Sequence, residues 1–285
     1  MPHLVALRSH QVSTADGTML YVTDYMLPPA HARGSVVLMH GLGEHSGRYR
    51  SLAGFFNQCG LSVRAYDHRG HGRSQGKRGD VINGDPMLQD AEIIVDDFST
   101  RYVQPPFLFG HSMGGLFAAR FALSRLAPLR GLILSSPALS LRLSAFQAIT
   151  FKLMHELAPS IGVPSALPAS LLSHDASVVA AYRADPLVHR KISARLLRSM
   201  QSSIAYCQTH AGSLSIPALM LVAGDDRLVD ADGSRQFFAH TPPGMAEIHV
   251  YDGMFHEIFN EPDAHRPRAE LKRWVEEVGL AMRFR

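Results

Sequence analysis

The chain has 285 residues, of which 46% are hydrophobic and 19% charged, a balance that suits one large domain with a fully buried core. Its formal net charge is only +3 and no run of lysine or arginine stands out, so nothing in the composition favours a nucleic-acid-binding protein. The N-terminal segment lacks the basic region and apolar run of a signal peptide, and no uninterrupted run of about 18 apolar residues predicts a membrane span.

The two cysteines, Cys59 and Cys207, lie in apolar, helix-like stretches without a CxxC motif or metal-ligand spacing. We expect both to be buried free thiols, and they give no reason to assume an oxidising compartment. The sequence therefore predicts a soluble, cytoplasmic protein, and it carries no signal for an oligomeric state.

The predicted elements begin with two strand-like segments, and Asp16-Gly17 between them indicates a hairpin. Short apolar runs then alternate with helical periodicity, an order typical of a largely parallel sheet covered by helices on both faces. The expected strands are residues 4–13, 19–27, 34–40, 61–66, 105–109, 129–135, 216–223 and 246–251, and the expected helices are residues 49–59, 86–102, 116–126, 232–240 and 264–282.

The alternation stops between residues 138 and 213. This segment has helical patches, several prolines and no clear strand, and residues 146–157 are strongly apolar. We therefore predict an inserted helical cap at residues 138–213, on an α/β core formed by residues 1–137 and 214–285.

A candidate nucleophile lies in residues 110–114 (GHSMG), which fit the G-x-S-x-G pattern between a predicted strand and a predicted helix. A sharp strand-to-helix turn exposes the hydroxyl of Ser112, and the flanking glycines let neighbouring backbone pass close by. The alternative is that small residues merely pack the turn. The strand and helix on either side favour Ser112 as a nucleophile.

A serine hydroxyl needs a base, and on this type of turn the chain order is serine, acid, histidine. His256 follows the last predicted strand and fits the base. Asp225 and Asp226 both follow the strand at residues 216–223, so spacing alone leaves the acid open. The acid would hold the imidazole tautomer while His256 takes the proton from Ser112.

Other histidines are also candidates for a functional role, because the chain has 16 of them. His40 and His111 flank tight turns and suit hydrogen-bonding roles. His68 and His71 could suggest a metal pair, but no second cluster has metal-ligand spacing. We therefore expect neither a metal nor a cofactor.

The developing negative charge on a reacting ester oxygen needs backbone donors. One is the N–H of Met113, which starts the helix after Ser112. The second should come from the glycine-rich loop at residues 40–45 (HGLGEH), where the N–H of Leu42 is the candidate.

Several motifs together resemble the monoacylglycerol lipase and lysophospholipase family of α/β-hydrolases. The likeness runs from about residue 34 to residue 261, although residues 139–172 match no motif of the family. The matching segments are residues 40–49 (HGLGEHSGRY), 67–74 (DHRGHGRS), 110–115 (GHSMGG), 184–188 (ADPLV), 224–230 (GDDRLVD) and 251–256 (YDGMFH).

The resemblance implies an α/β-hydrolase fold and hydrolysis of an ester on a glycerol that bears one acyl chain. It also selects Asp226, the residue before Arg227, as the acid. The predicted reaction converts monoacylglycerol to fatty acid and glycerol through an acyl-enzyme. Substrate-binding residues within 138–213 are not assigned, so acyl chain length and head group stay open.

The apolar character of the predicted cap suits an acyl tunnel, although part of it must pack the cap on the core. Any part that faces outward could contact a membrane surface and admit lipid. The apolar residues in question are Phe146, Ile149, Phe151, Leu153, Met154, Leu157, Ile161, Val163 and Leu167.

Three other functions compete with a monoacylglycerol lipase. A lysophospholipase or a carboxylesterase for short or aromatic esters would use the same machinery. A ligand receptor without turnover could also use this fold. Dehalogenases and epoxide hydrolases place an aspartate at the turn, so Ser112 argues against both.

Overall fold

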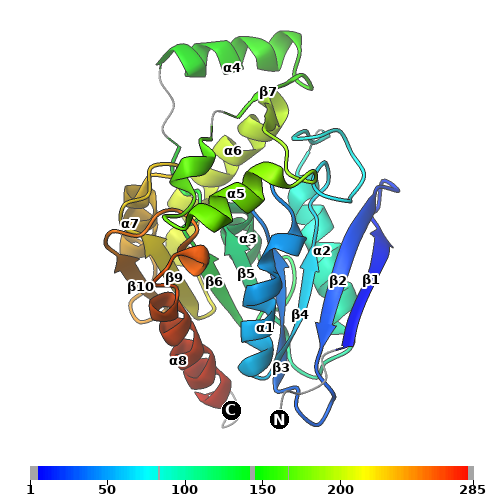
Figure 1. Cartoon of the computed structure of the whole chain (residues 1–285), viewed down its shortest axis with the longest axis vertical. Helices are drawn as coiled ribbons and strands as arrows, with labels where there is room; N and C mark the ends of the chain where they lie inside the picture. Colours follow the sequence, from blue (N-terminus) through cyan, green and yellow to red (C-terminus); the bar gives the residue numbers. More distant parts are fainter. Residues whose placement is uncertain (1–5, 83, 142–144, 166, 282–285) are drawn as a thin grey trace.

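An eight-stranded sheet forms the centre of the computed structural model, which describes residues 6–82, 84–141, 145–165 and 167–281 (Figure 1). Part of the first predicted strand, residues 4–5, and Met282 lie outside the described residues. The strands are β1 (Ala6–Ser13), β2 (Met19–Met26), β3 (Gly34–Met39), β4 (Leu61–Tyr66), β5 (Phe107–His111), β6 (Gly131–Ser135), β9 (Ala218–Ala223) and β10 (Ala246–Tyr251).

The strand order is β1-β2-β4-β3-β5-β6-β9-β10. β1 and β2 form the predicted hairpin, and β2 also runs antiparallel to β4. All other neighbours are parallel. Strands β3, β4, β5, β6 and β9 are buried along their whole length, which explains the largely apolar sequences of β3, β5, β6 and β9. In β4, the buried Arg64 forms an ion pair with Asp24. The mostly parallel α/β sheet predicted from the sequence is confirmed.

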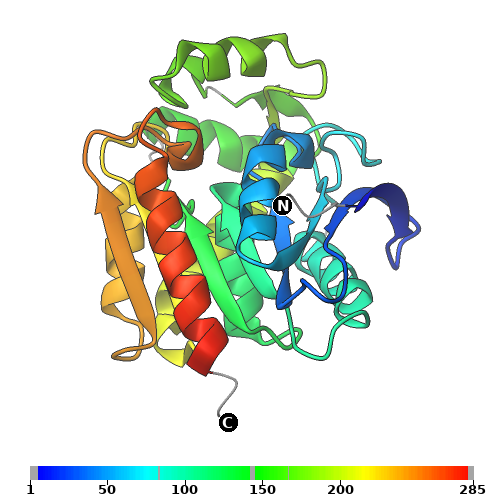
Figure 2. The same ribbon diagram turned by 60° about the horizontal axis from the view of Figure 1, so that its bottom comes forward.

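Helices cover both faces of this sheet (Figure 2). Buried side chains of four helices share one hydrophobic cluster with the sheet, and those of two helices share the other. The first set is α2 (Pro86–Ser99), α3 (Met113–Ser124), α6 (Ala194–His210) and α7 (Ala231–Ala239), and the second is α1 (Arg50–Gln58) and α8 (His265–Ala281).

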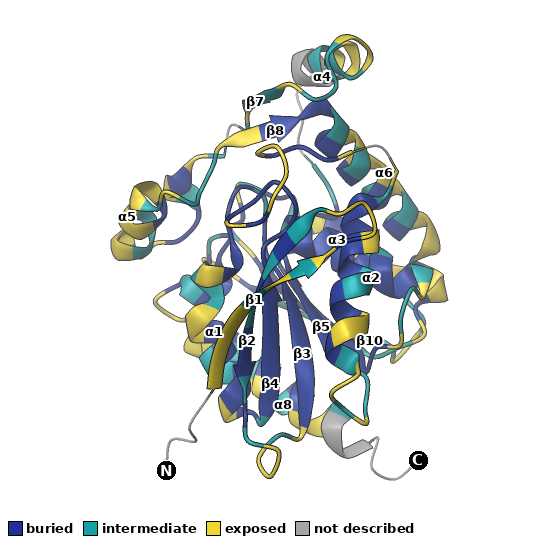
Figure 3. Ribbon diagram, turned by 90° about the vertical axis from the view of Figure 1, so that its right-hand side faces the viewer, coloured by how far each residue is buried: buried dark blue, intermediate teal, exposed yellow. Residues whose placement is uncertain are grey.

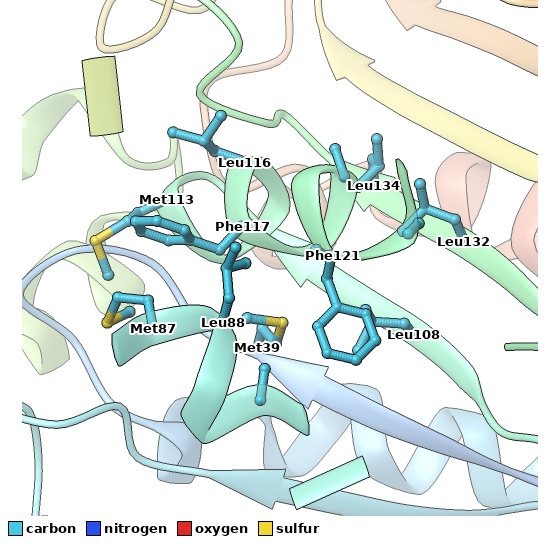
Figure 4. Packing of buried hydrophobic residues seen from close by; sticks show 14 of the residues in the cluster. Met39, Met87, Leu88, Leu108, Met113, Leu116, Phe117, Phe121, Leu132 and Leu134 are labelled. Atoms are coloured by element: carbon cyan, nitrogen blue, oxygen red, sulfur yellow. The ribbon is translucent and has the colours of Figure 1, made fainter. Parts of the chain in front are cut away.

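Helix α3 is buried along nearly its whole length. Figure 4 shows Phe117 and Phe121 of α3 pointing toward side chains of α2, β3 and β5. Both rings are at most 1% exposed, and burying a side chain of this size stabilises a fold by about 1.5–3 kcal/mol. This packing fixes where α3 begins, and so fixes the turn that carries Ser112.

The segment between β6 and β9 lies over the carboxyl ends of the parallel strands (Figure 1, Figure 3). The sequence showed no clear strand here, and the structure corrects this, because β7 and β8 pair antiparallel. Strands of three residues are too short to show periodicity. Besides α6, the segment contains α4 (Ala145–Leu157), β7 (Gly162–Pro164), α5 (Ala176–Ala184) and β8 (Lys191–Ser193).

Two parts of this segment differ in how they are held. Leu196, Met200 and Cys207 of α6 are buried and belong to the same hydrophobic cluster as α3. Helix α4 lies farthest from the sheet, at the top of Figure 1. No helix in the described part of the chain combines the length and apolar character needed to cross a bilayer. Cys59 and Cys207 are buried free thiols, as predicted.

Candidate active site

Ser112 lies at the sharp turn between β5 and α3, with φ 52° and ψ −118°. Its N–H donates to the carbonyl of Ser135 at 3.0 Å, and its own carbonyl accepts from the N–H of Ala138 at 3.0 Å. A side chain at Gly114 would place its Cβ 2.3 Å from the carbonyl oxygen of Met39. The second glycine of the motif is therefore required by close contact between α3 and the end of β3.

His256 and Asp226 form a buried pair. The Nδ1 atom of His256 lies 2.6 Å from Oδ2 of Asp226, and the two side chains are 5% and 2% exposed. Oδ1 of Asp226 accepts from the N–H groups of Leu228 and Val229 at 2.9 and 3.0 Å. The neighbouring carboxylate of Asp225 is 44% exposed and faces Arg227 instead. The contacts therefore place Asp226, not Asp225, beside the histidine.

Charge in this pair is set by opposing effects. Burial by itself would lower the pKa of His256, but the carboxylates of Asp226, Glu257 and Glu44 outweigh it and raise that pKa above its ordinary value. Burial would raise the pKa of Asp226, but His256 and the two backbone donors lower it. Asp226 is thus an ionised acceptor that stabilises a protonated imidazole.

The remaining histidines near the turn are neutral and hydrogen-bonded. Burial lowers the pKa of His40 to about 3 and that of His111 to about 4. Nε2 of His40 accepts from the N–H of His68 at 3.0 Å, so its Nδ1 donates to the carbonyl of Gly41 at 2.7 Å. Rings of His68 and His71 pack on His40. Within the described ranges, no group of three or more potential ligands could hold a metal ion.

The glycine-rich loop that carries Leu42 is held from both sides. The N–H of Gly41 donates to the carboxylate of Glu44 at 2.7 Å. The carbonyl of Gly43 accepts from the N–H of His189, which follows α5, at 2.8 Å. Gly43 has φ +78°, and a Cβ there would lie 2.4 Å from the carbonyl oxygen of His189. The peptide of Leu42 is fixed between these two contacts.

A second contact joins the same two segments. Nδ1 of His45 accepts from the N–H of Gly47, so its Nε2 donates to the carboxylate of Asp185 at 2.8 Å. Oδ1 of Asp185 in turn accepts from the N–H of Leu187 at 2.9 Å. Residues 184–188, singled out in the sequence without a role, therefore bind the loop expected to supply an oxyanion donor.

A cavity of about 70 Å³ connects these groups. Ser112, His256, Leu42 and Met113 all line it, so the structure brings together the predicted residues, with Asp226 behind His256. The volume between the described residues is below the about 300–1,000 Å³ typical of ligand pockets. The apolar part of the lining is Leu42, Met113, Ala138, Leu141, Leu167, Leu172, Met200, Leu228 and Val229.

The polar part of the lining contains three charged groups that sequence reasoning missed. Arg48 donates from both terminal nitrogens to the carboxylate of Glu257, at 2.7 and 2.8 Å, and from one of them to Glu44. The guanidinium also lies over the ring of Tyr182, 4.8 Å from its centroid. Glu44 and Arg48 lie within the segment HGLGEHSGRY, which was the available signal, whereas Glu257 had only its position after His256.

Of the nine apolar residues expected to form an acyl tunnel, Leu167 lines this cavity. Ile149, Leu153, Leu157 and Ile161 are more than half exposed instead. The side chain of Phe146 lies outside the described residues.

Comparison with known proteins agrees with this geometry. Residues 30–263 match the family described as serine aminopeptidase, S33. A monoacylglycerol lipase of Mycolicibacterium smegmatis is 34% identical over 279 residues, covering 94% of this chain and 97% of the relative. The chain belongs to the monoacylglycerol lipase family of α/β-hydrolases. The resemblance drawn from the sequence is confirmed.

A phospholipase and a solved lipase structure are also similar to this chain. A phospholipase of Bacillus subtilis, YtpA, is 33% identical, covering 80% of this chain and 89% of the relative. The crystal structure of a monoacylglycerol lipase from Paleococcus ferrophilus superposes with a TM-score of 0.80 at 32% identity, covering 96% of this chain and 99% of that one. The likeness includes the segment between β6 and β9.

The contact between Gly43 and His189 predicts a kinetic defect. Gly43→Ala should lower kcat by about 10²-fold with little change in KM, because the added methyl group displaces the loop that carries the Leu42 N–H. The matched control is Gly54→Ala in α1, where a Cβ meets nothing within 4 Å, and it should keep the parent kcat. Rates on a soluble short-chain ester, divided by the serines titrated with a fluorophosphonate, separate this effect from lost folded protein. An unchanged kcat in Gly43→Ala would contradict the role given to this contact.

Proposed function

We propose that this protein is a serine ester hydrolase that cleaves monoacylglycerol to fatty acid and glycerol. The observation that carries the proposal is one cavity in which a turn serine, a histidine paired with a buried aspartate, an apolar wall and a polar wall meet. An apolar wall suits an acyl chain, and a polar wall suits a glycerol. The names of the family's relatives support the same substrate.

The proposed mechanism runs through an acyl-enzyme. His256 takes the proton of Ser112 as Oγ attacks the ester carbonyl, and Asp226 stabilises the imidazolium that forms. The N–H groups of Leu42 and Met113 donate to the oxyanion. The ester C–O bond breaks, and glycerol leaves with the proton from His256. A water molecule activated by His256 then releases the fatty acid and restores the serine.

Residues 138–213 are proposed as a cap on the core formed by residues 1–137 and 214–285. Leu141, Leu167, Leu172 and Met200 come from this segment and contribute to the apolar wall. If this segment moves to admit a long chain, we expect the part that includes α4 to move, since α6 is packed into the core cluster.

Substitution of Ser112 tests the proposal. Ser112→Ala should lower kcat/KM on monoacylglycerols by several orders of magnitude, because the nucleophile is lost. Ser202→Ala, at an exposed position on α6, is the matched control and should retain full activity. Fatty acid release is measured for acyl chains of increasing length, with an aminoacyl anilide as a substrate that should not turn over.

The outcomes separate the competing functions. Preference for chains shorter than about four carbons would replace the lipase by a carboxylesterase, since an extended apolar wall then contributes nothing. Absence of turnover and of fluorophosphonate labelling in the parent protein would indicate a ligand receptor. Residual turnover in Ser112→Ala comparable to the parent would exclude Ser112 as nucleophile.

We also propose that the protein contacts membranes peripherally through α4 and the turn at residues 158–161 that follows it. Ile149, Leu153, Leu157 and Ile161 recur every four residues and are 69%, 57%, 76% and 53% exposed. At this spacing Ile149, Leu153 and Leu157 share one side of α4, the helix farthest from the sheet (Figure 3), and form an apolar stripe there. Ile161 follows the helix, just before β7. An exposed stripe of this kind suits insertion at a lipid surface.

The stripe predicts interfacial binding. Leu153→Ser combined with Leu157→Ser should abolish sedimentation with phosphatidylcholine vesicles and lower hydrolysis of monoacylglycerol presented in them. Hydrolysis of a soluble short-chain ester should not change. Val103→Ser removes an apolar side chain that is fully exposed elsewhere on the surface, and should affect neither measurement. Undiminished vesicle binding by the double variant would contradict the proposal.

We propose a cytoplasmic location for the protein because of the state of its two cysteines. Cys59 and Cys207 are buried and free, as is usual for proteins of a reducing compartment.

A further inference from the structure

We propose that residues 172–174 form a clasp that positions His256 for catalysis, with His174 as the positioning residue. The proposal rests on the proposed function, since it concerns the base of that reaction. The clasp belongs to the proposed cap, lies just before α5, and contacts the loop that carries His256. It links the cap to the catalytic base through hydrogen bonds, in addition to the cap side chains that line the cavity.

The backbone of the loop after His256 is bonded to the clasp at two points. The N–H of Glu257 donates to the carbonyl of Leu172 at 2.8 Å. The hydroxyl of Ser173 donates to the carbonyl of Asn260 at 2.8 Å. Because Glu257 directly follows His256, the first of these bonds fixes the backbone one residue away from the base.

His174 binds the end of the same loop through two donors. Its backbone N–H donates to Oε1 of Glu261 at 2.8 Å, and its Nδ1 donates to Oε2 of Glu261 at 2.8 Å. The side chain of Glu261 is 4% exposed, and no other group among the described residues donates to its carboxylate. Loss of the imidazole would leave one oxygen of a buried carboxylate without a partner, which is strongly unfavourable.

His174 also contacts the residue that precedes the base. Its ring stacks on that of Phe255, with the ring centroids 3.6 Å apart and 27° between the planes. His174 therefore contacts the chain on both sides of His256, at Phe255 and at Glu261. The loop cannot move His256 away from Asp226 without breaking one of these contacts, because both flanks of the base are held.

The segment that begins with the clasp holds the oxyanion loop at its other end. The N–H of His189 donates to the carbonyl of Gly43 at 2.8 Å, next to Leu42. One continuous segment, residues 172–189, therefore contacts both the loop of the base and the loop of the proposed oxyanion donor. Loosening its first end should misplace the base relative to that donor, and so slow the chemical step.

A role limited to the shape of the cavity gives a different expectation. Leu172 lines the cavity, so a clasp that only shaped the apolar wall would change KM for long acyl chains. A clasp that positions His256 changes kcat for every ester, including one too short to contact that wall. A short soluble ester therefore separates the two roles.

The test measures kcat and KM of full-length His174→Ala on p-nitrophenyl acetate, with rates divided by the serines titrated to completion with a fluorophosphonate. We expect kcat to fall at least about tenfold while KM stays within about twofold of the parent. His174→Asn should recover most of the lost kcat, because its amide nitrogen can donate to Glu261 from nearly the position of Nδ1.

Glu261→Gln is a second variant, which keeps the proposal testable if His174→Ala does not fold. It preserves the size of the side chain but replaces one acceptor oxygen by a donor, so it should lower kcat in the same way. The matched controls are His265→Ala and Glu276→Gln, which make the same changes at exposed positions on α8 and should keep the parent kcat.

Three results would overturn the proposal and leave the esterase function intact. These are a parent-like kcat in folded His174→Ala or Glu261→Gln, a rise in KM alone, and a kcat in His174→Asn as low as in His174→Ala. Failure of the parent protein to hydrolyse any ester would instead overturn the proposed function.

Discussion

The backbone of Ser112 is held at a positive φ of 52°, a strained conformation that costs a residue with a side chain about 1–3 kcal/mol. Two backbone hydrogen bonds hold it there, from Ser112 to Ser135 and from Ala138 to Ser112. Close contact between Gly114 and the end of β3 holds it from the other side. Burial of Phe117 and Phe121 in α3 offsets the strain. Because β3, β5, β6 and α3 meet at this turn, its position fixes where the cavity lies relative to the sheet and the helix.

The elements that the sequence predicted well are those in which the signal is local. Buried central strands show as continuous apolar runs, and the turn at Ser112 shows as two glycines around a serine. The acid was different, since spacing left Asp225 and Asp226 equal and only the family resemblance separated them. The structure distinguishes them by the burial of Asp226 and by its contact with His256, neither of which can be read from sequence spacing.

The features that the sequence did not predict depend on contacts between distant residues. Arg48 and Glu257 are 209 positions apart, and nothing local marks them as a pair. The contact of His189 with Gly43 joins two loops in the same way. Apolar composition also could not say which side of α4 faces outward, so the expected acyl tunnel residues include exposed ones such as Leu157.

The polar wall, the loop around Leu42 and the segment after α5 are one connected structure. Glu44 holds the loop through Gly41 and also pairs with Arg48 in the cavity wall. Asp185 holds the same loop through His45. The groups proposed to stabilise the oxyanion and to recognise the alcohol are therefore positioned by the same few contacts.

The most direct measurement compares kcat on monoacylglycerol for Asp226→Asn and Asp225→Asn, the same substitution at adjacent positions. If His256 is the base and Asp226 orients it, Asp226→Asn should lower kcat by about 10⁴-fold, because the amide favours the wrong imidazole tautomer. Asp225→Asn, at a half-exposed side chain, should stay within about threefold of the parent. Equal losses in the two variants, or near-parent activity in Asp226→Asn, would contradict the account.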